Sequence, residues 1–357
     1  MFFFLLFLFI ATGIHAEVAI VSLAGKGEFG FSDGEGNNAR FNIPIRLACD
    51  KEGNIIVADI FNNCIRKVTP NGSVSTIAGT KEGGYIDGDL GKAKFGAPHG
   101  VGVDSKGNIF VADLGSSTIR KISTDKTVTT FAGSGKPGFK DGKGKEAEFS
   151  FPHAIAIDSE DNLFIADISN NRIRKITPDG TVSTYAGSGE KGFRDGNASS
   201  AQFNMPIDVA VDKNGNLYVA DIGNQRIRKI QASPSNFWDA LLRFFGIKKI
   251  NVYTLAGNGR TGYKNGKGNE AKFNGPHGIA VDNNGNLIVA ELYNHVIRSI
   301  SQDGKVSTLC GNGEKGDIDG DGIKAQFNQP GGVTIDKDGN IIIADLYNHK
   351  VKKIILK

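Results

Sequence analysis

A repeat of 54 residues constrains this chain more than any other feature. The phrase F-x-x-P-x-x-x-x-x-D-x-x-G-N-x-x-x-A-D recurs with small variations, and its first residue stands at positions 41, 95, 149, 203, 273 and 327. Four of the five intervals are 54 residues, and one is 70 because sixteen residues are inserted between Ile230 and Val252. A fixed period of this length is typical of solenoids and propellers, in which each repeat covers the core of its neighbours.

Each repeat carries the pattern of four short strands. In the second repeat, segments 98–104, 107–113, 117–122 and 127–133 are rich in β-formers, and polar turns separate them. A four-stranded sheet cannot bury both of its faces alone. We therefore expect an all-β chain that forms a six-bladed β-propeller with four strands per blade.

The two ends of the chain fit together in this interpretation. The sixth repeat stops at its third strand, residues 350–357, while residues 18–25 match the pattern of a fourth strand. We expect the N-terminal strand to complete the last blade, which closes the ring and removes an exposed sheet edge.

Residues 1–16 have the length and the apolar centre of a signal peptide and are too short to span a bilayer. We therefore expect a propeller over residues 17–357 in a secreted, extracellular protein, periplasmic in a bacterial host. Three cysteines are too few for a disulfide framework. Asn71 and Asn197 begin N-x-S sequons, which are glycosylation sites in a eukaryotic host or chance occurrences.

The charge balance excludes one class of partner. The chain has 42 basic and 38 acidic residues, a formal charge of +4. Such a balance creates no strong field for nucleic acid, so we expect no nucleic-acid partner.

The repeat resembles that of the NHL family, in the form with glycine-rich loops found in teneurins and in many exported bacterial propellers. The resemblance rests on segments 108–122 and 216–230 and on six loops that begin with Ala-Gly or Cys-Gly, at positions 24, 78, 132, 186, 256 and 310. It covers nearly all of the chain after residue 16 and implies the propeller fold. NHL propellers include enzymes, sensors and binding modules, so the resemblance leaves the function open.

Histidine gives the sharpest chemical signal. His99, His153 and His277 each follow the repeat proline at the start of an expected innermost strand, near the mouth of the central channel. They are candidate zinc ligands, or structural histidines that hydrogen-bond inside the channel. Their placement is similar to the Pro-His zinc ligands of peptidyl-hydroxyglycine amidating lyases, which also use a functional tyrosine; Tyr293 and Tyr347 are candidates for that role.

Three other patterns receive structural interpretations. An acidic residue and a basic residue seven positions later recur in every repeat, from Asp59 with Arg66 to Asp345 with Lys352, and indicate an ion pair that braces each blade. The G-x-G-x-x-G segments lack the helix that a dinucleotide site needs. Asp317, Asp319 and Asp321 begin a calcium-loop pattern, but Asn328 stands where the bidentate acid belongs, so calcium is a weaker candidate than zinc.

The insertion carries a candidate docking element. Residues 234–249 have the pattern of an amphipathic helix, and its apolar residues are Phe237, Trp238, Leu241, Leu242 and Phe245. The helix either packs on the propeller or docks a protein partner or a membrane surface.

These observations favour an exported NHL-repeat propeller that acts as a binding scaffold for a protein or a small-molecule ligand. The alternative is a zinc-dependent lyase or hydrolase with its histidine site at the channel mouth. The sequence leaves enzymatic activity open and favours the scaffold.

Overall fold

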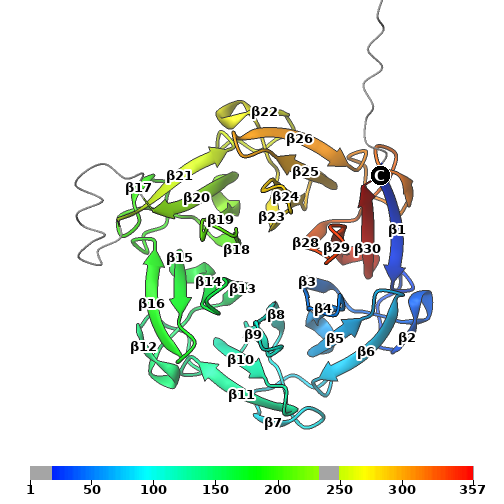
Figure 1. Ribbon diagram of the computed structural model, residues 1–357, viewed down its shortest axis with the longest axis vertical. Coiled ribbons are helices and arrows are strands. Elements are labelled where there is room, and N and C mark those ends of the chain that lie inside the picture. Colours follow the sequence, from blue (N-terminus) through cyan, green and yellow to red (C-terminus); the bar gives the residue numbers. More distant parts are fainter. Residues whose placement is uncertain (1–17, 233–248, 357) are drawn as a thin grey trace, which may run out of the picture.

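Six blades surround a central axis (Figure 1). The computed structural model describes residues 18–232 and 249–356. Every blade is one antiparallel sheet of five strands, so the predicted six-bladed propeller is confirmed. The fifth strand, which the sequence did not predict, is a two-residue segment of the glycine-rich loop on the outer edge of each blade. The described residues contain 3-10 turns but no helix of the length and hydropathy that crossing a membrane requires.

The strands nearest the axis start at the repeat prolines. These innermost strands are β3 (Pro44–Cys49), β8 (Pro98–Val103), β13 (Pro152–Ile157), β18 (Pro206–Val211), β23 (Pro276–Val281) and β28 (Pro330–Ile335). The second strands are short, buried apolar runs that end in an acidic residue: β4 (Ile55–Asp59), β9 (Ile109–Asp113), β14 (Leu163–Asp167), β19 (Leu217–Asp221), β24 (Leu287–Glu291) and β29 (Ile341–Asp345).

The outer strands complete each sheet. The third strands are β5 (Cys64–Val68), β10 (Thr118–Ile122), β15 (Arg172–Ile176), β20 (Arg226–Ala232), β25 (Val296–Ile300) and β30 (Lys350–Leu356). The fourth strands are β6 (Ser73–Ala78), β11 (Thr127–Ala132), β16 (Thr181–Ala186), β21 (Ile250–Ala256), β26 (Lys305–Cys310) and, in the sixth blade, β1 (Val18–Ala24). The two-residue fifth strands are β2 (Gly34–Glu35), β7 (Gly88–Asp89), β12 (Gly142–Lys143), β17 (Gly196–Asn197), β22 (Gly266–Lys267) and β27 (Gly320–Asp321).

The 3-10 turns occupy two places in the repeat. One set follows the second strands: η2 (Ile60–Asn62), η4 (Ile168–Asn170), η5 (Ile222–Asn224) and η7 (Leu346–Asn348). The other set lies in the glycine-rich loops: η1 (Gly36–Asn38), η3 (Gly144–Glu146) and η6 (Gly268–Glu270).

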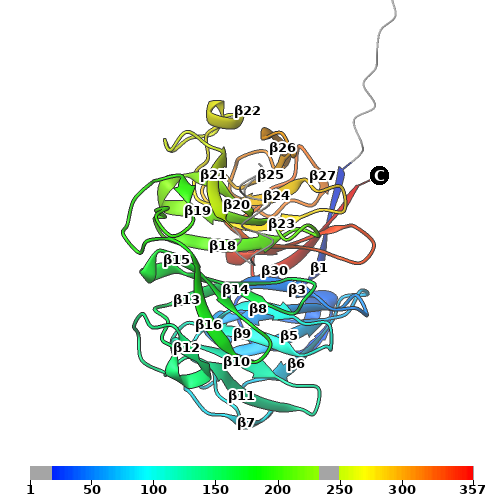
Figure 2. The same ribbon diagram turned by 60° about the vertical axis from the view of Figure 1, so that its left-hand side comes forward.

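The sixth blade is built from both ends of the chain. Strand β1 pairs antiparallel with β30, from Val18 opposite Leu356 to Ala24 opposite Val351. Figure 2 shows β1 and β30 side by side along the edge of the ring. Residues 18–24 therefore supply the fourth strand of the blade that ends the chain.

A buried cation braces every blade, as the sequence pattern indicates. In the third blade, Arg174 Nη1 lies 2.9 Å from Asp167 Oδ2, and the guanidinium stands 4.9 Å from the Phe139 ring centroid and 5.1 Å from that of Phe149. The equivalent pairs are all buried: Arg66–Asp59, Arg120–Asp113, Arg228–Asp221, Arg298–Glu291 and Lys352–Asp345. This repeated cluster fixes the second and third strands of each blade in one geometry.

Candidate functional site

Because six equivalent strands surround the axis, each blade contributes one residue to every level of the central channel. The first residue after the repeat proline forms the histidine level, which consists of Ile45, His99, His153, Ile207, His277 and Gly331. The next residue forms the ion-pair level, which consists of Arg46, Gly100, Ala154, Asp208, Gly278 and Gly332. Both levels lie in the first half of the innermost strands, so they occupy one end of the channel.

The structure brings the three predicted histidines together. The ring centroids of His99 and His153 are 3.5 Å apart, and those of His153 and His277 are 5.8 Å apart. The Nδ1 atoms of His99 and His153 lie 3.1 Å and 2.7 Å from the carbonyl oxygens of His153 and Ile207 in the next blade. A carbonyl only accepts, so these two rings carry their proton on Nδ1 and link neighbouring blades.

The His277 ring has two partners at the same nitrogen. Its Nδ1 lies 2.8 Å from Arg46 Nη1, which only donates, and 3.2 Å from the carbonyl oxygen of Gly331, which only accepts; the shorter contact makes Nδ1 the acceptor from Arg46. The carbonyl of Gly331 is 3.3 Å from the same Nη1 and accepts from it. Burial holds the pKa of all three imidazoles well below its usual value, and the positive charge of Arg46 lowers it further. The rings are therefore neutral at physiological pH.

The sequence predicts that His99, His153 and His277 bind zinc, and the hydrogen bonds and charges around the three rings can be compared with that prediction. His99 and His153 donate through Nδ1 to carbonyls, which leaves the lone pair on Nε2 of each ring for a metal, whereas the guanidinium beside His277 repels a cation. Within residues 18–232 and 249–356, no three or more His, Cys, Asp or Glu side chains are grouped so that they could hold a metal ion. The zinc site stays a prediction that metal analysis can test.

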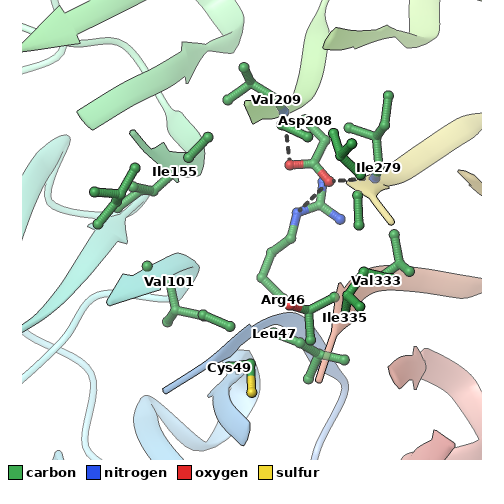
Figure 3. A pocket seen from close by; sticks show the side chains of 18 of the residues that line it. Arg46, Leu47, Cys49, Val101, Ile155, Asp208, Val209, Ile279, Val333 and Ile335 are labelled. Carbon is green, nitrogen blue, oxygen red and sulfur yellow. Dashed lines mark hydrogen bonds and ion pairs between the residues drawn. The ribbon is translucent and has the colours of Figure 1, made fainter. Parts of the chain in front are cut away.

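Arg46 and Asp208 meet across the channel from opposite blades (Figure 3). Arg46 Nε lies 3.7 Å from Asp208 Oδ2, and both side chains are buried. Asp208 accepts from the backbone N–H groups of Val209 and Ile279, each at 2.9 Å. The other four blades carry glycine or alanine at this level, which leaves room for two long side chains in the centre.

The pair also satisfies backbone groups that the fold leaves free. Innermost strands are sheet edges, so half of their N–H and C=O groups point towards the axis without a partner strand. Arg46 Nη2 donates to the carbonyls of Ile207 at 3.0 Å and His277 at 3.4 Å. Arg46 thus spans the channel and binds the edges of the fourth, fifth and sixth blades.

A cavity of about 280 Å³ lies on the other side of this pair from the histidines. Its floor is the Arg46–Asp208 pair, and its walls are apolar side chains of the same six strands (Figure 3). Six of them form a collar next to the floor: Leu47, Val101, Ile155, Val209, Ile279 and Val333. Further along lie Cys49, Val103, Ile157, Val281 and Ile335. Sequence reasoning missed this cavity.

Exposed apolar side chains surround the histidine end of the channel. We call Phe61, Phe151, Met205, Tyr293 and Tyr347 the mouth rim; their exposed fractions are 60%, 44%, 46%, 55% and 49%. Phe151 and Met205 directly precede innermost strands. The other three sit in the turn after a second strand, and each donates its backbone N–H to the carbonyl two residues before an innermost strand, at 3.2 Å.

The mouth rim involves five of the six blades. The turn position is aromatic in the first, fifth and sixth blades, whereas it is Gly115, Ser169 and Gly223 in the others. In the third and fourth blades the residue before the proline is large instead. The second blade has Ala97 and Gly115 at the two positions, so the rim is open there. The pattern becomes visible in the sequence when the residue before the repeat proline is compared with the turn position after the second strand in every repeat.

The remaining predicted sites have separate locations. Asp317 and Asp319 of the calcium pattern contact Lys352 at 2.8 Å and 3.2 Å, and Asp317 also contacts Lys350 at 2.6 Å. Asn71 and Asn197 are exposed, as glycan acceptors must be. The candidate leader 1–16 and the insertion residues Phe237, Trp238, Leu241, Leu242 and Phe245 lie outside the described residues. Cys64 and Cys310 are buried, Cys49 is half-buried, and all three are free thiols.

Comparisons with known proteins agree with this architecture. Segments 95–122, 203–230, 273–298 and 327–354 match the family profile of the NHL repeat. NHL repeat-containing protein 2 of Gallus gallus is 29% identical over 349 residues, which cover 88% of this chain and 46% of that protein. Teneurin-4 of Mus musculus is 23% identical over 87% of this chain and 12% of its own length. The chain thus spans less than half the length of these curated relatives.

A solved structure shows the same fold at low identity. An auxiliary nutrient binding protein from Bacteroides ovatus superimposes with a TM-score of 0.72 at 16% identity, over 96% of this chain and 78% of that one. At this identity the likeness concerns the propeller architecture alone.

Proposed function

Because this chain is an NHL-repeat propeller, we propose that it is a binding scaffold that takes a protein or peptide partner at the histidine end of its channel. The observation that carries the proposal is the mouth rim. Five large apolar side chains, four of them aromatic, stand exposed around one opening. Aromatic residues and methionine are enriched in protein interfaces, and exposed apolar patches of this kind mark interaction sites.

The arrangement of the rim favours a polypeptide partner. Polar side chains accompany two of these aromatic residues in the chain: the half-buried His295 and His349 each stand two residues after Tyr293 and Tyr347. Alternating apolar anchors and hydrogen-bonding groups suit a peptide, which presents both kinds of group along its length. Two propellers of similar fold are described as auxiliary nutrient binding proteins, which supports binding as a role for this architecture.

The proposal includes export. Residues 1–16 have the composition of a signal peptide, so the partner would be an extracellular or periplasmic protein. Mass spectrometry of the protein purified from its host tests this step. A mature N-terminus at Glu17 supports export, and an intact N-terminus at Met1 contradicts it.

A peptide-display selection tests the binding site. A random peptide library is selected on the immobilised protein, and the enriched peptides are measured against a triple variant, Phe61→Ser, Tyr293→Ser and Tyr347→Ser. Serine already occupies this position in the third blade, as Ser169, so the fold should tolerate the changes. We expect binding to weaken at least about tenfold, since truncating a central aromatic anchor costs about 2 kcal/mol or more.

The matched control is Ile323→Ser, which removes a side chain of similar exposure beside β27, on the outer edge of the sixth blade. Peptides should bind this variant as tightly as the unchanged protein. Equal binding to the triple variant, or no enriched peptide, would overturn the proposed site.

A further inference from the structure

The Arg46–Asp208 pair has one unused donor. Arg46 is 4% exposed, and its buried Nε has no hydrogen-bond partner within residues 18–232 and 249–356. The 3.7 Å from Nε to Asp208 Oδ2 is too long for a hydrogen bond. Asp208 Oδ2 accepts one backbone N–H, from Ile279, and a carboxylate oxygen has room for a second donor. A donor and an acceptor, both incompletely satisfied, thus lie side by side in the two residues that form the floor of the axial cavity.

A hydroxyl group complements this floor. Its oxygen can accept from Arg46 Nε while its hydrogen is donated to Asp208. A carboxylate would meet Asp208 with like charge, and an ammonium would meet Arg46 in the same way. The floor pair is neutral as a whole, so an uncharged ligand avoids the cost of burying a lone charge.

The walls define the rest of the ligand. Two sets of Val, Ile and Leu side chains, together with Cys49, line the cavity above the floor. Its volume of about 280 Å³ is roughly twice that of an engineered cavity of about 150 Å³ that binds benzene. A six-membered ring with one or two substituents therefore fits.

We propose that the axial cavity binds a small neutral molecule that carries a hydroxyl group on an apolar body. This site lies on the opposite side of the Arg46–Asp208 pair from the mouth rim, so it does not depend on the partner site proposed above. Loss of one would leave the other intact.

Benzyl alcohol and toluene test the proposal because they differ by the hydroxyl group. Cys49 lines the cavity, while Cys64 and Cys310 are completely buried, so methyl methanethiosulfonate should modify Cys49 selectively. We expect benzyl alcohol to protect Cys49 at a concentration at least about tenfold lower than toluene does. The Cys49→Ser variant identifies the modified thiol.

The double variant Arg46→Met and Asp208→Leu removes the polar floor and keeps its bulk. In this variant we expect benzyl alcohol and toluene to protect Cys49 at equal concentrations, because only the hydroxyl contact is lost. Retained preference for the alcohol would overturn the assignment of the floor. If the double variant does not fold, the unchanged protein decides alone: equal protection by both compounds, or protection by neither, overturns the proposal and leaves water as the occupant.

Discussion

Arg46 of the first blade and Asp208 of the fourth blade meet at the centre of the ring, with Nε 3.7 Å from Oδ2. Both strands are sheet edges on opposite sides of the axis, and the pair ties them together without any backbone pairing between them. Arg46 also donates to carbonyls of the fourth, fifth and sixth blades. The contact therefore couples the two halves of the ring.

A double-mutant cycle measures this coupling. Arg46→Met leaves Asp208 as a buried carboxylate without a counter-charge, and we expect a loss of about 3–5 kcal/mol in the free energy of unfolding. Asp208→Leu should cost a similar amount. The double variant should be at least about 2 kcal/mol more stable than the sum of the two losses predicts. Urea unfolding followed by circular dichroism of the backbone gives the free energies of unfolding. Additive losses would show that the two side chains act separately.

The sixth blade shows which second substitution should accompany replacement of a buried arginine by lysine. Lys352 stands there in place of arginine, and Asp317 stands in place of the aromatic residue that covers the guanidinium, as Phe139 does in the third blade. Arg174→Lys should cost about 1–3 kcal/mol, because one ammonium cannot reach every acceptor that Arg174 satisfies. Adding Phe139→Asp should recover at least about 1 kcal/mol, since Asp317 contacts Lys352 at 2.8 Å.

Phe139→Asp in the Arg174 background is the control for this exchange. It removes a ring whose centroid lies 3.7 Å from the guanidinium carbon of Arg172 and 4.9 Å from that of Arg174. The substitution should therefore lower the free energy of unfolding on its own. Chemical denaturation of the four proteins checks the result. A double variant no more stable than Arg174→Lys alone would rule out the exchange.

The repeat made the blades predictable, because its period and turn residues describe local structure that recurs six times. The histidines were predictable for a different reason: three blades carry them in one column, which marks them as a group. Arg46 and Asp208 are single exceptions in a column of small residues, so neither stood out. Their relation depends on which blades face each other across the axis, and only ring geometry supplies that. The mouth rim escaped notice because it alternates between two columns of the repeat.

His295 and His349 make the stability of the ring depend on pH. Gln329 N donates to His295 Nδ1 at 3.1 Å, and Ile43 N donates to His349 Nδ1 at 3.2 Å, so both nitrogens must be unprotonated. Burial lowers the pKa of both imidazoles, and Lys315 lowers that of His295 further. The unfolded chain then binds protons more readily than the folded one. The contribution of these two histidines to the free energy of unfolding is complete above about pH 6.5, the pKa of histidine in the unfolded chain. It is lost as the pH falls from there towards the lower pKa of the folded chain.

The first and third blades provide the matched variant. Asn63 and Asn171 accept the equivalent backbone N–H groups, at 3.1 Å and 3.0 Å, without titrating. We expect the urea concentration at the unfolding midpoint to decrease when the pH is lowered from about 7.5 to about 5. The double variant His295→Asn and His349→Asn should show a smaller decrease. The remaining decrease would come from the three channel histidines. An identical fall in the variant would assign the effect elsewhere.

Zinc analysis separates the scaffold from the lyase-like alternative. His99 and His153 donate through Nδ1 to backbone carbonyls, so their Nε2 atoms are the possible zinc ligands, but Arg46 Nη1 stands 2.8 Å from His277 Nδ1. A divalent cation at this level would have to displace the guanidinium or tolerate its charge. We expect the protein, incubated with zinc and then dialysed, to retain less than about a tenth of an equivalent. Stoichiometric zinc that disappears in the triple variant His99→Ala, His153→Ala and His277→Ala would instead establish the histidine level as a metal centre.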